Sequence, residues 1–393
     1  MNTTLTDPES RESQAAAEIS IEQKETEGLS QGQIVRRRFF RHRGALISMI
    51  VLAFIVILAF TSVGVDLWGL QIPGWWMWRW DQISPKINNG VPTLSLLPPQ
   101  FGIHPFGQDE VGRDIFAVVM RGAQQSIMVM VIAGVVATVI GVVIGAVAGY
   151  YGKITDSILM RFTDIVITIP LIVIGSVLGN TFGSLGAAVL GVVIGIFAWT
   201  TMARLVRGEF LSLREREFVD AARVSGARDR RIIFRHILPN AIGVIVVNAT
   251  LLMAGAILLE SALSFLGFGV QSPDTSLGKI VSDNQAAFST RPWIFWWPGI
   301  FIIAIALCVN FIGDGLRDAF DPRQKKMPSE RAMRRAGRAT GPAVPILDTT
   351  EPKEPRSVTV PMEAVYTGDV VNYHDPRPEE PGDVQDEPLN PER

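Results

Sequence analysis

The amino-acid sequence predicts an all-α integral membrane protein with six transmembrane helices. Hydrophobic residues make up 48% of the 393 residues and charged residues only 19%, and the mean hydropathy is +0.28. This composition is too apolar for an ordinary soluble chain of this length. The charges are also segregated from the apolar runs. Five segments contain no Asp, Glu, Lys or Arg: residues 44–65, 126–149, 165–203, 240–259 and 293–313.

Each charge-free segment is long enough to cross a bilayer, which takes roughly 20 apolar residues. A charge near the centre of a spanning helix costs about 2.5–3.5 kcal/mol, so the absence of charge favours insertion. Segment 165–203 is about twice the required length. Turn-forming residues near its middle therefore predict two spans joined by a short loop: Gly179, Asn180, Thr181, Gly183 and Ser184. The segments thus give six spans, and Pro170 is expected to kink the third.

The positions of the positive charges predict that both chain ends lie in the cytoplasm. Arginines crowd the entry to the first span, at positions 36, 37, 38, 41 and 43, and basic residues follow the last span at positions 317, 323, 325 and 326. With six crossings, the segment between spans four and five is also cytoplasmic. The nine arginines between positions 204 and 235 support the same orientation.

These features predict four regions. Residues 1–35 are expected to form a disordered cytoplasmic N-terminus, and residues 36–121 the first transmembrane helix with an extracytoplasmic loop. Residues 122–314 are expected to form a five-helix core with a cytoplasmic loop at 213–240, and residues 315–393 a cytoplasmic, mostly disordered tail. No cleavable signal is expected, because the first apolar run is longer than a signal-peptide core. The single cysteine, Cys308, excludes an internal disulfide.

Small and polar residues within the spans suggest how the helices pack. Small residues recur every four positions in two expected spans and let helix backbones approach closely: Ala133, Ala137, Gly141, Gly145 and Gly149, then Ala187, Gly191 and Gly195. We interpret them as packing stripes; a moving interface between subunits is the alternative. Asn248 and Asn310 are the candidates for a solute path, whereas Glu260 is expected to lie at the interface or pair helices.

A basic, partly amphipathic insert, residues 217–239, separates spans four and five. Apolar residues at i, i+3 and i+4 predict one short helix (Phe218, Ala221, Ala222), and a second stripe predicts another (Ile233, Phe234, Ile237, Leu238). Gly226 permits a turn between them, and Pro239 is expected to mark the return to the membrane. The insert is therefore predicted to be a helix-turn-helix knob that meets a partner. Alternatively, its arginines lie flat on anionic lipid.

The insert resembles the cytoplasmic signature of permease subunits of ABC importers. That signature is Glu-Ala-Ala, three residues, Gly, nine residues, then Ile-x-Leu-Pro. It is matched at Asp220, Ala221, Ala222, Gly226, Leu238 and Pro239. Asp220 replaces the Glu, and His236 occupies the Ile position. Both departures resemble the second-permease type of the branch that imports dipeptides, oligopeptides and nickel.

Three further blocks, residues 104–116, 258–269 and 313–323, resemble the same branch, so that the resemblance covers roughly residues 36–323. It implies a fold like that of type I ABC importer permeases, in a bacterial cytoplasmic membrane. It also implies that the insert docks on an ATPase. The implied partners are a homologous permease, two ATPase subunits and an extracytoplasmic solute-binding protein, with no nucleic acid.

The chain itself is expected to be non-catalytic and to bind no cofactor. Its Gly-Lys pairs at 152–153 and 278–279 lack the spacing and the following Ser or Thr of a phosphate-binding loop, so ATP is expected to be used by partner subunits. All four histidines lie outside the expected spans, which argues against an intramembrane enzyme. Peptides are the leading expectation for the cargo; nickel or another small solute is the alternative, and a gated channel is the alternative mechanism.

Two features of the extracytoplasmic loop also need an interpretation. Four tryptophans, at positions 75, 76, 78 and 80, are expected to anchor the loop at the lipid interface; contact with a solute or with a binding protein is the alternative. Asp109, Glu110 and Asp114 lack the alternating oxygen ligands and glycine of a calcium loop, so a metal site is not expected there.

Overall fold

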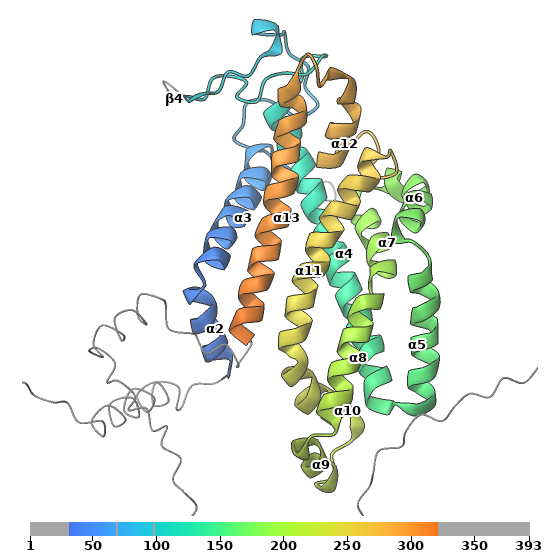
Figure 1. Cartoon of the computed structure of the whole chain (residues 1–393). Helices are drawn as coiled ribbons and strands as arrows, with labels where there is room; N and C mark the ends of the chain where they lie inside the picture. Colours follow the sequence, from blue (N-terminus) through green and yellow to red (C-terminus); the bar gives the residue numbers. More distant parts are fainter. Residues whose placement is uncertain (1–30, 68–69, 97–98, 321–393) are drawn as a thin grey trace, which may run out of the picture. The chain divides into compact units, whose positions relative to one another are not determined.

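The structure, a computed structural model, describes residues 31–67, 70–96 and 99–320. Four helices in these ranges are long and apolar enough to cross a membrane unbroken (Figure 1). They are α3 (Arg43–Ser62), α4 (Ile115–Tyr151), α11 (Leu238–Phe265) and α13 (Pro292–Phe320). Two bent pairs complete the six predicted spans: α5 (Lys153–Thr168) with α6 (Leu171–Phe182), and α7 (Ala187–Ala198) with α8 (Thr200–Arg214). The prediction of an all-α membrane protein is confirmed.

The third span breaks where proline predicts a kink. The chain bends by 75° between α5 and α6, at Ile169 and Pro170. Both residues have extended backbone, because proline lacks a backbone N–H and disfavours a helical conformation in the preceding residue. A second break, of 47°, separates α7 from α8 at Trp199. The sequence did not predict this second break.

Two details of the predicted third and fourth spans are wrong. Gly179, Asn180 and Thr181 lie inside α6, and the chain turns later, at η2 (Gly183–Leu185) and at Gly186, whose φ is 97°. The two bent helices also run beyond segment 165–203, to Lys153 at one end and Arg214 at the other. Charged residues therefore lie on both helices, and Asp156 and Arg207 pair with each other there.

The small-residue stripes bring α4 close to its neighbours, as predicted. A Cβ atom at Gly141 would lie 2.6 Å from Met202 Cβ, and one at Gly149 would lie 2.6 Å from Phe210 Cβ, both on α8. At Gly195 on α7, a Cβ atom would lie 2.7 Å from Val136 Cβ on α4. These separations leave no room for a methyl group, so the glycines permit the contact between helices.

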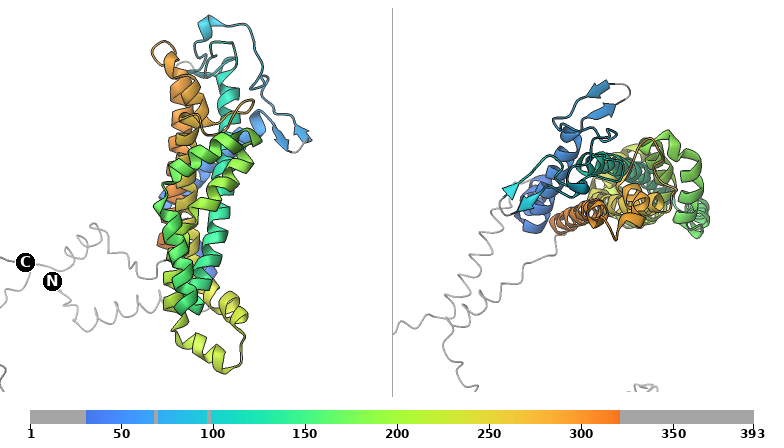
Figure 2. Two further views of the ribbon diagram at one scale, coloured as in Figure 1. Left: turned by 90° about the vertical axis from the view of Figure 1, so that its right-hand side faces the viewer. Right: turned by 90° about the horizontal axis from the view of Figure 1, so that it is seen from above.

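Short elements cover the two ends of the bundle. At one end lie two antiparallel hairpins, β1 (Val65–Leu67) with β2 (Leu70–Ile72) and β3 (Ser95–Leu96) with β4 (Pro99–Gln100), together with η1 (Asn88–Gly90), α12 (Leu277–Asp283) and η4 (Gln285–Ala287). At the opposite end lie α2 (Gln31–Arg41), α9 (Glu217–Val224), α10 (Asp229–Arg231) and the π-helical turn η3 (Ile232–Ile237). Figure 2 shows the α9–α10 segment projecting beyond the spans.

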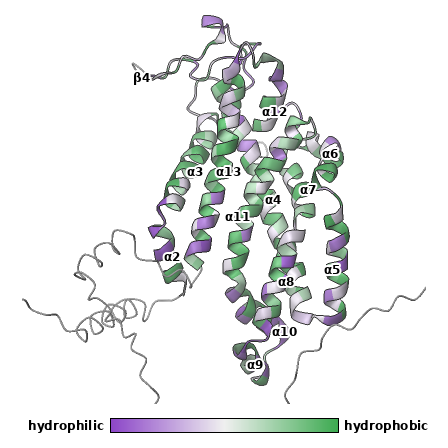
Figure 3. Cartoon of the chain, viewed as in Figure 1, coloured by the Kyte–Doolittle hydropathy of each residue, from purple (hydrophilic) through white to green (hydrophobic). Residues whose placement is uncertain are grey.

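The hydropathy of the residues along the chain follows this division. Apolar residues cover most of the spans, while polar residues gather at α2, α9 and α10 (Figure 3). Helix α2 begins at Gln31, within the segment that was expected to be disordered, and α13 continues to Phe320. The expected disorder of residues 1–30 and 321–393 falls outside the described residues.

Candidate coupling site and solute path

The insert between the fourth and fifth spans folds as a knob, defined here as residues 217–231, on the end of α8. Val219 on α9 is fully buried and packs in one cluster with Phe210 of α8 and with Ile232 and Ile237 of η3. The buried residue is thus Val219 and not the predicted stripe, because Phe218 and Ala221 are exposed. The predicted helix-turn-helix is present, but Phe218 and Ala221 of the stripe used to predict its first helix are exposed, and only Ala222 packs against the buried cluster.

Gly226 ends α9 in a Schellman motif. The N–H of Ala227 donates to Ala222 O at 3.0 Å, and that of Gly226 donates to Arg223 O at 2.9 Å. Gly226 has a φ of 78°, in the left-handed region that glycine adopts without strain. No atom lies within 4 Å of where its Cβ would be. A side chain at this position would therefore point into open space and would meet only a partner.

Pro239 does not end the second helix, contrary to the prediction. The helix runs without interruption from Asp229 to Phe265. The turn before Pro239 is π-helical, and Leu238 N donates to Ile233 O, five residues back. Asn240 Nδ2 donates to the His236 carbonyl at 2.6 Å. A π turn and a side-chain donor accommodate the missing proline N–H, so the knob and the fifth span share one helix.

Polar contacts fasten the base of the knob to the end of α4. Tyr150 Oη donates to Asp229 Oδ1 at 2.8 Å. Arg214 Nη1 donates to the carbonyls of Gly149 and Tyr150 at 3.0 and 3.4 Å. These are the last carbonyls of α4, where the helix dipole favours a cation. The knob is therefore held to α4 as well as to α8.

The outer face of the knob is partly apolar. Val224 is 91% exposed, Phe234 of the adjoining η3 is 62% exposed and Phe218 is 39% exposed. Asp220, which replaces the Glu of the ABC-permease signature, pairs with Arg223 at 3.0 Å on the same helix. Exposed apolar residues rimmed by charge are typical of surfaces that contact a protein.

A cavity of about 500 Å³ lies beside the two broken spans. Its wall includes Ile169, Pro170 and Leu171 at the first break, and Thr200 and Thr201 just after the second. Asn248 of α11 also lines it, with its amide donating to Val244 O at 2.8 Å. Asn310 lies on α13 and is not part of this wall, so the structure does not bring the two candidate asparagines together.

Glu260 links three segments near the outer end of α11. Its side chain is fully buried. Ser126 Oγ of α4 donates to Glu260 Oε2 at 2.8 Å, and Ser264 Oγ donates to Oε1 at 2.6 Å. Ser126 Oγ also accepts the N–H of Leu277, the first residue of α12. This geometry fits the helix-pairing interpretation of Glu260.

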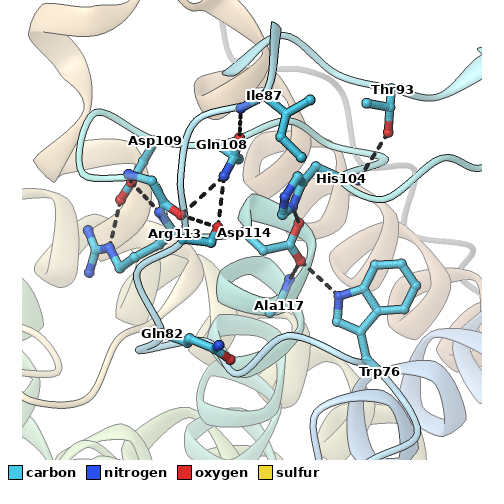
Figure 4. Close-up of polar contacts among 12 residues, drawn as sticks. Trp76, Gln82, Ile87, Thr93, His104, Gln108, Asp109, Arg113, Asp114 and Ala117 are labelled. Carbon is cyan, nitrogen blue, oxygen red and sulfur yellow. Dashed lines mark hydrogen bonds and ion pairs between the residues drawn. The ribbon is translucent and has the colours of Figure 1, made fainter. Parts of the chain in front are cut away.

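At the opposite end of the bundle from the knob, Asp114 organises the loop before α4 (Figure 4). Its Oδ2 accepts the N–H of Ala117, which caps α4, and the indole N–H of Trp76, at 2.9 and 2.8 Å. His104 Nδ1 lies 2.9 Å from Asp114 Oδ1. When the Asp114 carboxyl is ionised it can only accept, so in that state Nδ1 carries the imidazole proton. Burial raises the pKa of the Asp114 carboxyl, and these hydrogen bonds oppose the shift.

The neighbouring acids have other structural roles. Asp109 Oδ1 accepts the backbone N–H groups of Val111, Gly112 and Arg113, and its Oδ2 accepts Arg113 Nε at 2.6 Å. Glu110 is exposed. Asp109 and Asp114 thus each accept hydrogen bonds from their own N–H donors. The sequence contains one signal of such a role: Asp114 stands directly before the helix α4, where an Asp side chain commonly caps the first turn.

The four tryptophans of the loop before α4 make different contacts. Trp76 packs on Phe116 with ring centroids 4.6 Å apart, Trp78 stacks on His104 at 5.0 Å, and the Arg121 guanidinium lies 5.6 Å from the Trp80 ring. Trp76 and Trp80 thus contact residues of α4, whereas Trp78 packs on His104 within the loop, and all three side chains stay partly exposed. Trp75 is 61% exposed and donates to Thr61 Oγ1 at the end of α3. The anchor role of these tryptophans stays a prediction.

Comparison with known proteins identifies the class of this chain. Residues 141–326 match the family model for the inner membrane component of binding-protein-dependent transport systems, and residues 30–99 match that for the N-terminal transmembrane domain of oligopeptide transport permease C. The protein is therefore a multi-pass transport subunit of the bacterial inner membrane.

The particular family follows from similar proteins that span nearly the whole described chain. The oligopeptide transport system permease protein OppC of Haemophilus influenzae is 38% identical over 305 residues, which cover 78% of this chain and 93% of that protein. The OppC of Escherichia coli is 39% identical over 316 residues, or 80% and 99% of the two chains. That of Mycobacterium tuberculosis is 36% identical over 303 residues, or 77% and 98%. The chain belongs to the OppC family of ABC importer permeases, and the predicted resemblance is confirmed.

Proposed function

We propose that this chain is the permease subunit through which an ATP-driven importer moves di- or oligopeptides into the cell. The observation that carries the proposal is its identity of 36–39%, over more than three quarters of the chain, with proteins named as oligopeptide permeases. The chain binds no cofactor itself. ATP is bound and hydrolysed by separate subunits.

The knob couples that hydrolysis to the spans. Its exposed apolar residues fit a groove on an ATPase, and the open space around Gly226 leaves room for a close approach. The coupling residues are Asp220, Ala221, Ala222, Gly226, Leu238 and Pro239. Because α8 and α11 both continue into the knob, a displacement of the knob moves two spans at once. Coupling of this kind requires two discrete arrangements of the spans.

The solute path follows the cavity beside the broken spans. Asn248 lines this cavity and, with Thr200 and Thr201, offers polar groups in a mostly apolar wall. Asn310 lies on another helix, so its role in the path would require the homologous second permease or a different arrangement of the spans. The full assembly contains that second permease, two ATPase subunits and an extracytoplasmic solute-binding protein, with both ends of this chain in the cytoplasm.

The first experiment identifies the cargo and the energy source. The solute-binding protein that copurifies with the complex would be analysed for the molecule that it retains, and uptake of that molecule would be measured in reconstituted vesicles. We expect peptides, and uptake only with ATP. Retained nickel would replace the peptide proposal, and uptake without ATP would contradict an ATP-driven importer and favour a channel.

The second experiment tests the knob. We expect Gly226→Asp to abolish uptake while membrane insertion stays normal, because the added carboxylate points outward and meets nothing within this chain. Gly226→Asn is the matched control, since Asn has the same shape without the charge and tolerates a positive φ. Normal uptake by the Asp variant would count against a coupling role.

A further inference from the structure

The third span is fastened to the bundle differently from its neighbours. α4 meets α7 and α8 through glycines that leave no room for a side chain. By contrast, Thr163 is the one buried residue of α5, a helix that lies entirely in the described ranges. The contacts that reach from α5 to α8 include two ion pairs.

These ion pairs form two rungs between antiparallel helices. Arg207 Nη2 donates to Asp156 Oδ2 at 2.7 Å and Nε donates to Oδ1 at 2.5 Å, so the pair is bidentate. Arg204 Nη2 donates to Asp164 Oδ1 at 2.6 Å. We call Asp156, Asp164, Arg204 and Arg207 the α5–α8 ladder. The Asp156 and Arg207 side chains are 16% and 34% exposed, and those of Asp164 and Arg204 are 52% and 46% exposed.

The first rung is better shielded from solvent than a surface ion pair, because the side chains of Asp156 and Arg207 are mostly buried. Both helices belong to spans, where a charge without a partner is far more costly than in water. Removing one partner of a partly buried pair leaves the other charge uncompensated. The least costly way for α8 to move is therefore with its partners on α5 still attached.

The ladder lies between the knob and the broken part of the third span. At its lower end, α8 runs into the knob, which Arg214 and Asp229 also tie to α4. At its upper end, α5 reaches the 75° break at Pro170 in the wall of the cavity. A displacement of α8 thus reaches the cavity wall through the ladder, with the break serving as a pivot.

We propose that the ladder is the element that makes the third span follow the knob, and that Asp156, Asp164, Arg204 and Arg207 are positioning residues for transport. This inference rests on the proposed coupling role of the knob. It adds a route from the knob to the cavity wall that the signature residues do not contain.

The test uses the complete transporter in vesicles. In the double variant Asp156→Asn, Asp164→Asn, we expect the ATPase subunits to copurify normally, while the uptake per ATP hydrolysed falls about tenfold, within the range of ordinary coupling free energies. Exchanging the charges of the first rung, with Asp156→Arg and Arg207→Asp, should restore most of the uptake that the single Asp156→Arg variant loses. Arg161→Gln, which removes an exposed charge from the same helix, is the control and should behave as wild type.

A distance measurement tests the same idea without relying on uptake. Spin labels would be placed at Ile154 on α5, which is 75% exposed, and at Ser212 on α8, which is also exposed, in a Cys308→Ser background. We expect the distance between the labels to stay constant as nucleotide is added to the wild type, and to change or broaden in the double variant. A changing distance in the wild type would overturn the proposal.

The remaining outcomes separate this inference from the function on which it rests. Loss of the ATPase subunits from the double variant would overturn the ladder as a transmission element, because the defect would then lie in docking. Unchanged coupling in that variant would also overturn it, while leaving the result for Gly226→Asp as an independent test of the knob. An exchange of charges that restores nothing would show that the pair itself is not what matters.

Discussion

Asp114→Ala should strongly destabilise the loop between α3 and α4, which lies at the opposite end of the bundle from the knob. The substitution removes the side chain that caps α4 and that accepts hydrogen bonds from Trp76 and His104. Both of the latter donors belong to the loop between α3 and α4. The side chain therefore joins the loop to the first turn of a helix of 37 residues.

The size of the effect follows from these contacts. Loss of an N-cap side chain costs about 1 kcal/mol, and each buried donor left without an acceptor costs about 1–3 kcal/mol. We expect a total loss of about 2–4 kcal/mol for the alanine variant, from the cap and the His104 donor, because Trp76 is only half-buried and can find water.

Asp114→Asn is the matched control and should be close to wild type. An amide oxygen in place of Oδ2 still accepts from Ala117 and Trp76, and an amide nitrogen in place of Oδ1 can donate to His104 Nδ1. The imidazole can move its proton to Nε2, which has no partner among the described residues. The amide also avoids the burial of a charge.

Thermal unfolding of the purified protein in detergent measures the difference. We expect the Tm of Asp114→Ala to fall well below that of Asp114→Asn, with normal ATPase copurification for both variants at low temperature. Equal Tm values for Ala and wild type would refute the structural role of Asp114. A fall in Tm for Asn as large as that for Ala would refute the hydrogen-bond assignment.

Three further predictions concern packing, pH and the knob. Gly145→Leu should lower stability by about 1–3 kcal/mol, because a Cβ atom there would lie 2.4 Å from Ala203 O. Gly208→Leu is the control and should not lower stability, because no atom lies within 4 Å of where its Cβ would be. Equal Tm values for the two variants would contradict the close packing of α4 on α8. Burial raises the pKa of Asp114, so the contribution of this group to stability is greatest below its ordinary pKa of 3.8 and is lost as pH rises through the raised pKa. This part of the pH dependence of stability should vanish in Asp114→Asn. If it persists in that variant, another group causes it. Gly226→Val should lower stability by about 1–2 kcal/mol through its positive φ, and Gly226→Asn by less; the reverse order would contradict the Schellman motif.

The sequence predicts the spans well because hydrophobicity and the absence of charge can be read from one continuous segment. Charge-free runs of sufficient length mark the membrane segments, and Pro170 marks the break in the third span through its own missing N–H. The bend at Trp199 has no such mark, because neither proline nor glycine stands there. It depends on how α7 and α8 pack against α4, which no local pattern records.

Predictions that depend on contacts between distant residues were less successful. Asp156 and Arg207 are 51 residues apart, and their pairing lets both helices extend past the charge-free segment. Trp76 and Asp114 are 38 residues apart, and their hydrogen bond ties an expected lipid anchor to the start of α4. At Pro239 the local rule failed because a π turn and the Asn240 side chain together accommodate the missing N–H. The signature residues of the insert, by contrast, are close in sequence and were assigned from their spacing, and their role in coupling stays a prediction.

The central claim is that the knob faces the cytoplasm and is covered there by an ATPase. Val224 is 91% exposed at the tip of α9, and a single cysteine placed there in a Cys308→Ser background can be labelled with a membrane-impermeant maleimide. We predict no labelling in intact cells, strong labelling in inside-out vesicles stripped of ATPase subunits, and protection when those subunits are added back. Labelling in intact cells, or no protection by the ATPase, would contradict the account.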